Sequence, residues 1–299
     1  MNYTRNISIV FIILFFSSLL QAQKFSSYEK EMQAWQQKRI QALKDPNGWI
    51  NLTGLFWLKP GKNTFGSALS NDFVYSHKNM PNNAGYFLWE NKQVYWVSNS
   101  GIAITIKDSV ITKALVFEEG KNPAPLMALG SLRWNIIQRE EKIGIRLRDL
   151  ALPLLASFKG TARFALDSSL RILAHLEPVQ KNNLLIANVL GQINAMPSPG
   201  KLVFSIEGKT YTLDALEEGD ELFILFGDAT SGKETYPAGR FLYTNKPDAN
   251  GNTILDFNKA FNPPCAFTKF ATCPLPPKQN ILPISIKAGE KNYHTIDLK

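Results

Sequence analysis

The sequence predicts a mainly β protein with an antiparallel, sandwich-like or barrel-like fold and one N-terminal amphipathic helix. Hydrophobic residues follow helical spacing in one stretch near the start, and after residue 49 the spacing changes to that of strands. The strand-like runs follow one another at short intervals, with no helix of crossover length between them. Parallel strands need such crossovers, so an antiparallel arrangement is expected.

Composition sets the broad class of protein. The chain has 299 residues, of which 44% are hydrophobic and 19% charged, which excludes a disordered protein. The length is sufficient to bury a core without a disulfide framework. The formal net charge is +8, but the lysines and arginines are scattered and no nucleic-acid-binding module is present. We therefore expect no nucleic-acid partner.

Residues 1–22 have the pattern of a signal peptide. Arg5 precedes the apolar run from Ile7 to Leu20, and Ala22 offers a cleavage site. The run is shorter than the roughly 20 residues needed to cross a bilayer, and an uncleaved anchor is the alternative. We expect a mature chain that begins near Gln23, has no membrane span and is periplasmic or secreted.

Residues 23–48 are assigned to the N-terminal helix. Ser26 and Glu29 form a capping box, and apolar residues then follow helical spacing through Lys44. The Asp-Pro-Asn-Gly sequence at 45–48 ends the helix, because proline cannot continue the hydrogen-bond ladder and glycine accepts a left-handed turn. Trp35 is expected to pack on the body of the protein.

Two β-domains are expected after the helix, at 49–178 and 179–299, although the two halves could also share one core. Strand-like runs in the first domain cover 49–58, 86–90, 93–97, 102–106, 132–138 and 142–148. Those in the second domain cover 184–189, 202–206, 211–213 and 221–226.

A loop rich in proline and cysteine covers 262–283 and contains both cysteines of the chain. In an exported protein, Cys265 and Cys273 are expected to form a disulfide. Two buried thiols, or a metal or catalytic role, are the alternatives. The three histidines lie far apart in sequence, so we expect no metal site and no cofactor.

The densest polar cluster surrounds Arg240, which is expected at the start of a strand with Asp228 and Asp256 as its partners. An arginine there can bind a carboxylate of a ligand or of the protein itself. The tyrosines and asparagines nearby can contact a sugar, or pack and cap turns. The candidate ligand-binding residues are Asp228, Tyr236, Arg240, Asp256, Asn258 and Asn262.

Two functions are compatible with this cluster. The first is a ligand-binding or envelope-associated β-protein whose partner is a small molecule or a glycan, with its site near Arg240. The second is a hydrolase or lyase that acts on envelope or glycan material. That enzyme would use Asp228, Asp256 and Glu290 as acid and base, with Arg240 orienting an anionic substrate.

Several motifs resemble those of the uncharacterised domain-of-unknown-function family sixteen eighty-four of bacteria and archaea, over nearly the whole mature chain. They are the run 48–58 (GWINLTGLFWL), Gly227-Asp228, Gly239-Arg240-Phe241, 255–258 (LDFN), 262–267 (NPPCAF) and 273–277 (CPLPP). The resemblance implies no activity. Residues 58–117 are faintly similar to forkhead-associated sandwiches through Gly61, residues 65–67 and Asn71-Asp72. Ser67 stands where that family has its phosphothreonine-binding arginine, so the similarity implies a fold and no phosphopeptide binding.

Overall fold

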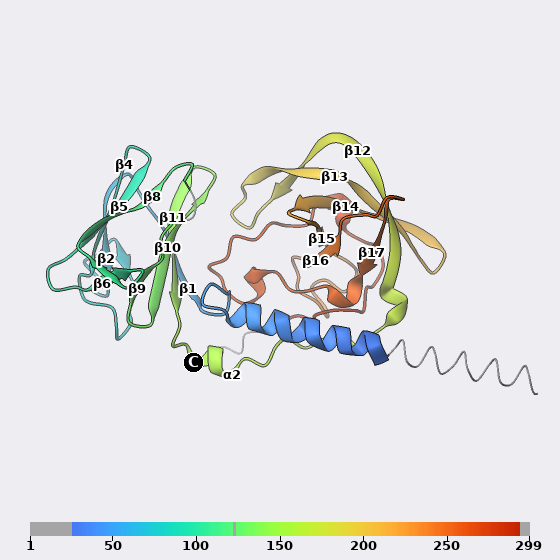
Figure 1. Cartoon of the computed structure of the whole chain (residues 1–299), viewed down its shortest axis with the longest axis horizontal. Helices are drawn as coiled ribbons and strands as arrows, with labels where there is room; N and C mark the ends of the chain where they lie inside the picture. Colours follow the sequence, from blue (N-terminus) through green and yellow to red (C-terminus); the bar gives the residue numbers. More distant parts are fainter. Residues whose placement is uncertain (1–25, 122–123, 294–299) are drawn as a thin grey trace, which may run out of the picture. The chain divides into compact units, whose positions relative to one another are not determined.

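The computed structural model describes residues 26–121 and 124–293, and the expected signal peptide lies outside them. The described residues form two compact units (Figure 1). The barrel unit comprises 26–41, 160–266 and 273–293, and the sandwich unit comprises 42–121, 124–159 and Phe267–Thr272. The predicted mainly β, antiparallel fold with an N-terminal helix is confirmed. Within the described ranges, no helix is long and apolar enough to cross a bilayer.

The N-terminal helix covers residues 26–44, as the sequence predicts. It buries Met32 and Leu43, which lie on its apolar stripe. The helix ends at a turn in which Gly48 N donates to the carbonyl of Asp45 at 2.6 Å. A side chain on Gly48 would collide with the carbonyl of Leu43, so only glycine fits this turn.

The sandwich unit contains two sheets that share one core. The first has the order β1 (Leu52–Trp57), β11 (Lys142–Asp149), β10 (Leu132–Arg139), β9 (Met127–Leu129), β6 (Ile104–Ile106) and β7 (Ser109–Ile111). The second has the order β3 (Phe73–Val74), β2 (Gly61–Gly66), β4 (Gly85–Glu90), β5 (Gln93–Ser98) and β8 (Lys113–Glu118). Phe65, Trp96 and Trp134 pack edge to face between them. A short helix, α2 (Pro153–Ser157), follows.

The barrel unit is built on one six-stranded sheet that nearly closes on itself. Its order is β16 (Arg240–Asn245), β15 (Glu221–Phe226), β14 (Lys209–Glu218), β13 (Ile193–Ile206), β12 (Arg171–Ala187) and β17 (Asn252–Asp256). Neighbouring strands are antiparallel throughout. Four 3-10 turns complete the part of this unit that the structure describes: η1 (Ser168–Leu170), η2 (Phe257–Lys259), η3 (Pro264–Ala266) and η4 (Lys278–Asn280). The N-terminal helix lies along one side of this unit (Figure 1).

The described part of the chain from Cys273 onward, which begins with the end of the proline-rich loop, packs into the barrel rather than forming a tail. Leu282, Ile286 and Ala288 join Leu242 and Leu255 in the barrel core. Because this segment is not part of a sheet, its backbone has no regular hydrogen bonds to a neighbouring strand. Buried polar side chains bond to the backbone there instead. Asn280 Nδ2, for example, donates to the carbonyl of Leu225 at 2.8 Å.

The hairpin of β12 and β13 is longer than the sequence indicates. The predicted seam near residue 178 falls inside β12, while the two units divide between Lys159 and Gly160. Pro178 pairs with Gly200, and the register shifts between Pro178 and Asn182. Such an irregularity accommodates a proline within a strand. Residues that are typical of a turn therefore lie inside a sheet here.

Candidate functional site

A pocket of about 500 Å³ opens where the barrel closes. β16 and β17 are the two ends of the strand order, and threonine side chains link them. Thr244 Oγ1 donates to the carbonyl of Ile254 at 2.7 Å, and Thr253 Oγ1 donates to the carbonyl of Asn245 at 2.9 Å. These bonds join the strands where β16 ends and β17 begins, and the pocket lies along the same edges. We call it the seam pocket.

The lining of the seam pocket combines rings with charges of both signs. Its side chains come from the N-terminal helix, from β16 and β17, and from the residues around them. The aromatic ones are Trp35, Tyr243 and Phe261, the acidic ones Glu31, Glu221, Asp248 and Asp256, and the basic ones Arg171, Lys246 and Lys259.

Three half-buried rings form an aromatic wall. The rings of Tyr243 and Phe261 are stacked, with centroids 6.0 Å apart and planes at 12°, and Trp35 lies tilted against Phe261 at 6.5 Å. Trp35 therefore packs on the body of the barrel unit, as expected, and lines the pocket as well. The Tyr243 hydroxyl donates to Glu218 Oε2 at 3.0 Å. Burial, reinforced by Glu218, raises the pKa of the Tyr243 phenol, so its ring stays neutral.

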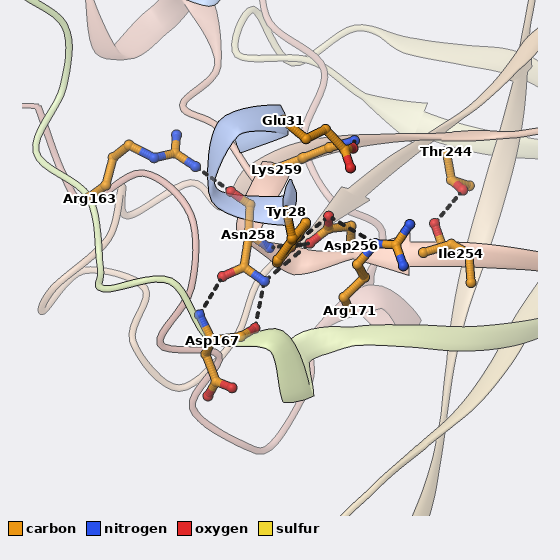
Figure 2. Close-up of polar contacts among 10 residues, drawn as sticks. All are labelled: Tyr28, Glu31, Arg163, Asp167, Arg171, Thr244, Ile254, Asp256, Asn258 and Lys259. Carbon is orange, nitrogen blue, oxygen red and sulfur yellow. Dashed lines mark hydrogen bonds and ion pairs between the residues drawn. The ribbon is translucent and has the colours of Figure 1, made fainter. Parts of the chain in front are cut away.

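The N-terminal helix is fixed to the barrel beside the pocket (Figure 2). The Tyr28 hydroxyl donates to Asp256, with both carboxylate oxygens 2.8 Å away. Burial and this hydrogen bond raise the pKa of the Tyr28 phenol. Lys259 Nζ donates to Glu31 Oε1 at 2.7 Å, and this ion pair lowers the pKa of the Glu31 carboxyl.

Asp256 and Asn258 are buried and bonded to the protein itself (Figure 2). Besides Tyr28, Asp256 Oδ1 accepts from the backbone and the side-chain nitrogens of Asn258, each at 3.1 Å. Asn258 exchanges two further bonds with the backbone of Asp167, at 2.7 and 3.0 Å, and Arg163 donates to its carbonyl. Of the six predicted ligand-binding residues, Asp256 lines the seam pocket, and its carboxylate already has four donor contacts.

Arg240 and Asp228 form a buried ion pair away from this pocket. Arg240 Nη2 lies 2.8 Å from Asp228 Oδ2, and both side chains are 0% exposed. The guanidinium also donates to the carbonyls of Ile286 and Ala288 in the core. Burial lowers the pKa of Arg240, and Asp228 opposes that shift. Asp228 is thus the partner that the sequence predicted, whereas the predicted pairing of Arg240 with Asp256 is wrong.

Asn262 and Glu290 belong to a second buried network. Asn262 N donates to Glu290 Oε2 at 2.7 Å, and Arg39 donates to the Asn262 carbonyl at 2.9 Å and lies 3.4 Å from Glu290 Oε1. Burial lowers the pKa of Arg39, against the effect of Glu290. The two predicted residues therefore join the helix to the C-terminal segment.

Tyr236 lies beside the two cysteines. Burial, together with Cys265 and Cys273, raises the pKa of the Tyr236 phenol. Cys265 and Cys273 are thiols, so the predicted disulfide is not formed in the structure. Cys265 N donates to Cys273 Sγ at 3.0 Å, and a hydrogen bond with Cys273 lowers the pKa of the Cys265 thiol. The described residues contain no group of three or more His, Cys, Asp or Glu that could hold a metal ion.

Sequence reasoning missed most of the seam pocket. Tyr28, Glu31, Arg171 and Lys259 come from elements that are distant in sequence, and no local motif marks them. One signal was available in the sequence, the amphipathic helix. Its apolar stripe with Trp35 indicated that it packs on the protein, so polar residues next to that stripe were expected to lie near other elements.

The chain is similar to several solved structures. An uncharacterized protein from Haloarcula marismortui, solved by solution NMR, is 27% identical, with a TM-score of 0.39, over 46% of this chain and 78% of that one. The FhaA FHA domain and a second structure of phosphothreonine-dependent FHA domain interactions are each 14% identical, with TM-scores of 0.22. They match 31% of this chain and 97% and 92% of their own. No curated protein matches.

The family model described as Protein of unknown function (DUF1684) matches residues 156–291. This range includes the motifs around Arg240, Asp256, Asn262 and Cys273, and it leaves the run 48–58 outside. The resemblance stated from those motifs is thereby confirmed, over a shorter part of the chain than expected. Over residues 156–291 the chain therefore matches the DUF1684 family.

Proposed function

We propose that this is an exported β-protein that binds a small polar ligand, a glycan, in the seam pocket. The observation that carries the proposal is the lining of that pocket, which combines three aromatic rings with charged side chains of both signs. Aromatic rings suit the apolar C–H groups of a sugar, and charged and amide groups suit its hydroxyls.

The two ends of the pocket follow from strand register. Arg171 pairs with Asp256 at one end of β17, and Glu221 pairs with Asn245 at the end of β16. β17 has five residues, which extend over about 15 Å. A ligand with polar groups along its length would therefore meet polar partners near both ends of β17.

Binding is favoured over hydrolysis by the state of the carboxylates. A general acid or base must reach the ligand and exchange a proton with it. Asp228 and Glu290 are 5% and 1% exposed, and Asp256 is occupied by Tyr28 and Asn258. The three carboxylates that the sequence offered for catalysis are thus bonded to the protein, so we propose a binding protein.

Export remains part of the proposal. The apolar run at 7–20 supports it, with a mature chain that begins near Gln23 and is periplasmic or secreted. In an oxidising compartment the contact between Cys265 and Cys273 supports their joining into a disulfide. The proline-rich loop would then be held by a covalent link as well as by packing.

Binding is tested by substituting two tyrosines, one in the pocket and one outside it. Both are half-buried, and both lie in the barrel unit. Tyr243 lines the seam pocket, and Tyr236 lies by the cysteines. We expect oligosaccharides from cell-envelope material to bind in isothermal titration calorimetry. Tyr243→Leu should weaken binding about tenfold, since it removes an aromatic ring from the lining of the pocket. Tyr236→Leu, the matched control, should leave binding unchanged.

Thermal melts of both variants separate a loss of folding from a loss of binding. The proposal fails if no oligosaccharide binds the native protein. It fails also if both variants, still folded, weaken binding equally.

A further inference from the structure

We infer that the ligand of the seam pocket carries an anionic group and that Arg171 binds it, an inference that rests on the proposed function. Arg171 is the first residue of β12 and lines the pocket at its Asp256 end. Its side chain is 44% exposed. Figure 2 shows it beside Asp256 and Tyr28.

The guanidinium of Arg171 is held in place without using its donors. Its Nε lies 3.9 Å from Asp256 Oδ2, which is beyond hydrogen-bond distance. Its central carbon lies 5.5 Å from the centroid of the Tyr28 ring, a cation–π contact. Among the described residues, the Arg171 side chain donates no hydrogen bond. The planar fork is therefore positioned by stacking and long-range attraction, and its N–H groups remain for a ligand.

The two carboxylates nearest to Arg171 are already bonded to other residues of the protein. Lys259 donates to Glu31 at 2.7 Å, which neutralises the carboxylate that would repel an anion. Asp256 accepts hydrogen bonds from Tyr28 and Asn258, so its oxygens already have donors from the protein. The Arg171 guanidinium therefore keeps all its N–H groups for a ligand, whereas Lys259 uses its charge on Glu31.

A carboxylate-bearing saccharide, such as a uronic acid, fits this arrangement. Its ring would contact the edges of Trp35, Tyr243 and Phe261, and its carboxylate would take two parallel hydrogen bonds from Arg171. The formal charge of +8 on the chain attracts anionic partners. A sulfate ester shares the same anionic chemistry, so it forms a separate arm of the test.

The test compares three sets of oligosaccharides of equal length by calorimetry: glucuronic acid oligomers, sulfated glucose oligomers and neutral glucose oligomers. We expect the native protein to bind the uronic acid set most tightly. Arg171→Gln should weaken that binding about tenfold or more, as expected for a charge-assisted hydrogen bond, and should alter neutral binding less than about threefold. Arg171→Lys keeps the charge and should recover only part of the affinity.

Lys233→Gln is the matched control, since Lys233 is exposed in the barrel unit outside the pocket and the change removes one positive charge. It should leave all three affinities unchanged, and melting temperatures confirm folding. Equal binding of acidic and neutral sets, unaffected by Arg171→Gln, would overturn the inference and leave the proposed function standing. Preference for the sulfated set would overturn the choice of a carboxylate. Absence of binding by all three would overturn both proposals.

Discussion

Arg240→Ala is expected to lower the free energy of unfolding of the barrel unit by about 3 to 5 kcal/mol, the cost of breaking a buried ion pair from one side. Asp228 would keep the donors Thr230 N at 2.8 Å and Thr230 Oγ1 at 2.6 Å, but it would lose its cationic partner. The carbonyls of Ile286 and Ala288 would lose a donor in the core as well.

Urea denaturation followed by circular dichroism measures this free energy, and Arg171→Ala provides the comparison. Arg171 is 44% exposed and 3.9 Å from its partner, so its removal should cost at most about 1 kcal/mol. Arg240→Lys should be intermediate, because lysine restores the charge without the planar fork that reaches several acceptors. A loss below about 1 kcal/mol for Arg240→Ala would refute the assignment of this pair to the stability of the core.

Three further predictions concern the helix, the thiols and the N-terminus. Tyr28→Phe should destabilise the barrel unit by about 1.5 to 3 kcal/mol in the same urea assay, since a buried Asp256 loses a donor. The lowered pKa of the Cys265 thiol means that its thiolate forms at a lower pH than usual. In reduced protein, Cys265 should therefore react with iodoacetamide at a lower pH than in the Cys273→Ala variant, and identical pH profiles would contradict this. Mass spectrometry of protein from the native host should find a terminus near Gln23, and an intact Met1 terminus would contradict the export prediction.

Local patterns were sufficient for the elements of the fold. The helix was predicted over 26–44 and is found there, because a cap, an apolar stripe and a Pro-Gly stop all agree. β15 was also predicted with its bounds, Glu221–Phe226, from a short apolar run between turn residues. The long β12–β13 hairpin was not, because its prolines are tolerated by a register shift that depends on the partner strand.

The pocket could not be predicted in the same way. It exists because β16 and β17 meet across the closure of a sheet and because the helix returns to them. The two strands are close in sequence, since Thr244 and Ile254 are 10 positions apart, but Tyr28 of the helix and its partner Asp256 are 228 positions apart. The sequence showed polar residues at strand ends, which is where sites are commonly built, but it did not show which ends are adjacent.

The wrong pairing of Arg240 with Asp256 has a simple geometric cause. Side chains alternate between the two faces of a strand. Arg240 shares its face with Leu242, which lies in the barrel core, whereas Asp256 shares its face with Ile254, which is 38% exposed. The two charges therefore lie on opposite sides of the barrel wall, one directed to the core segment and the other to the helix. In the sequences of both strands, Leu242 and Leu255 mark the side chains that face the core. Arg240 alternates with the same phase as Leu242, so its inward position predicts a structural role for it.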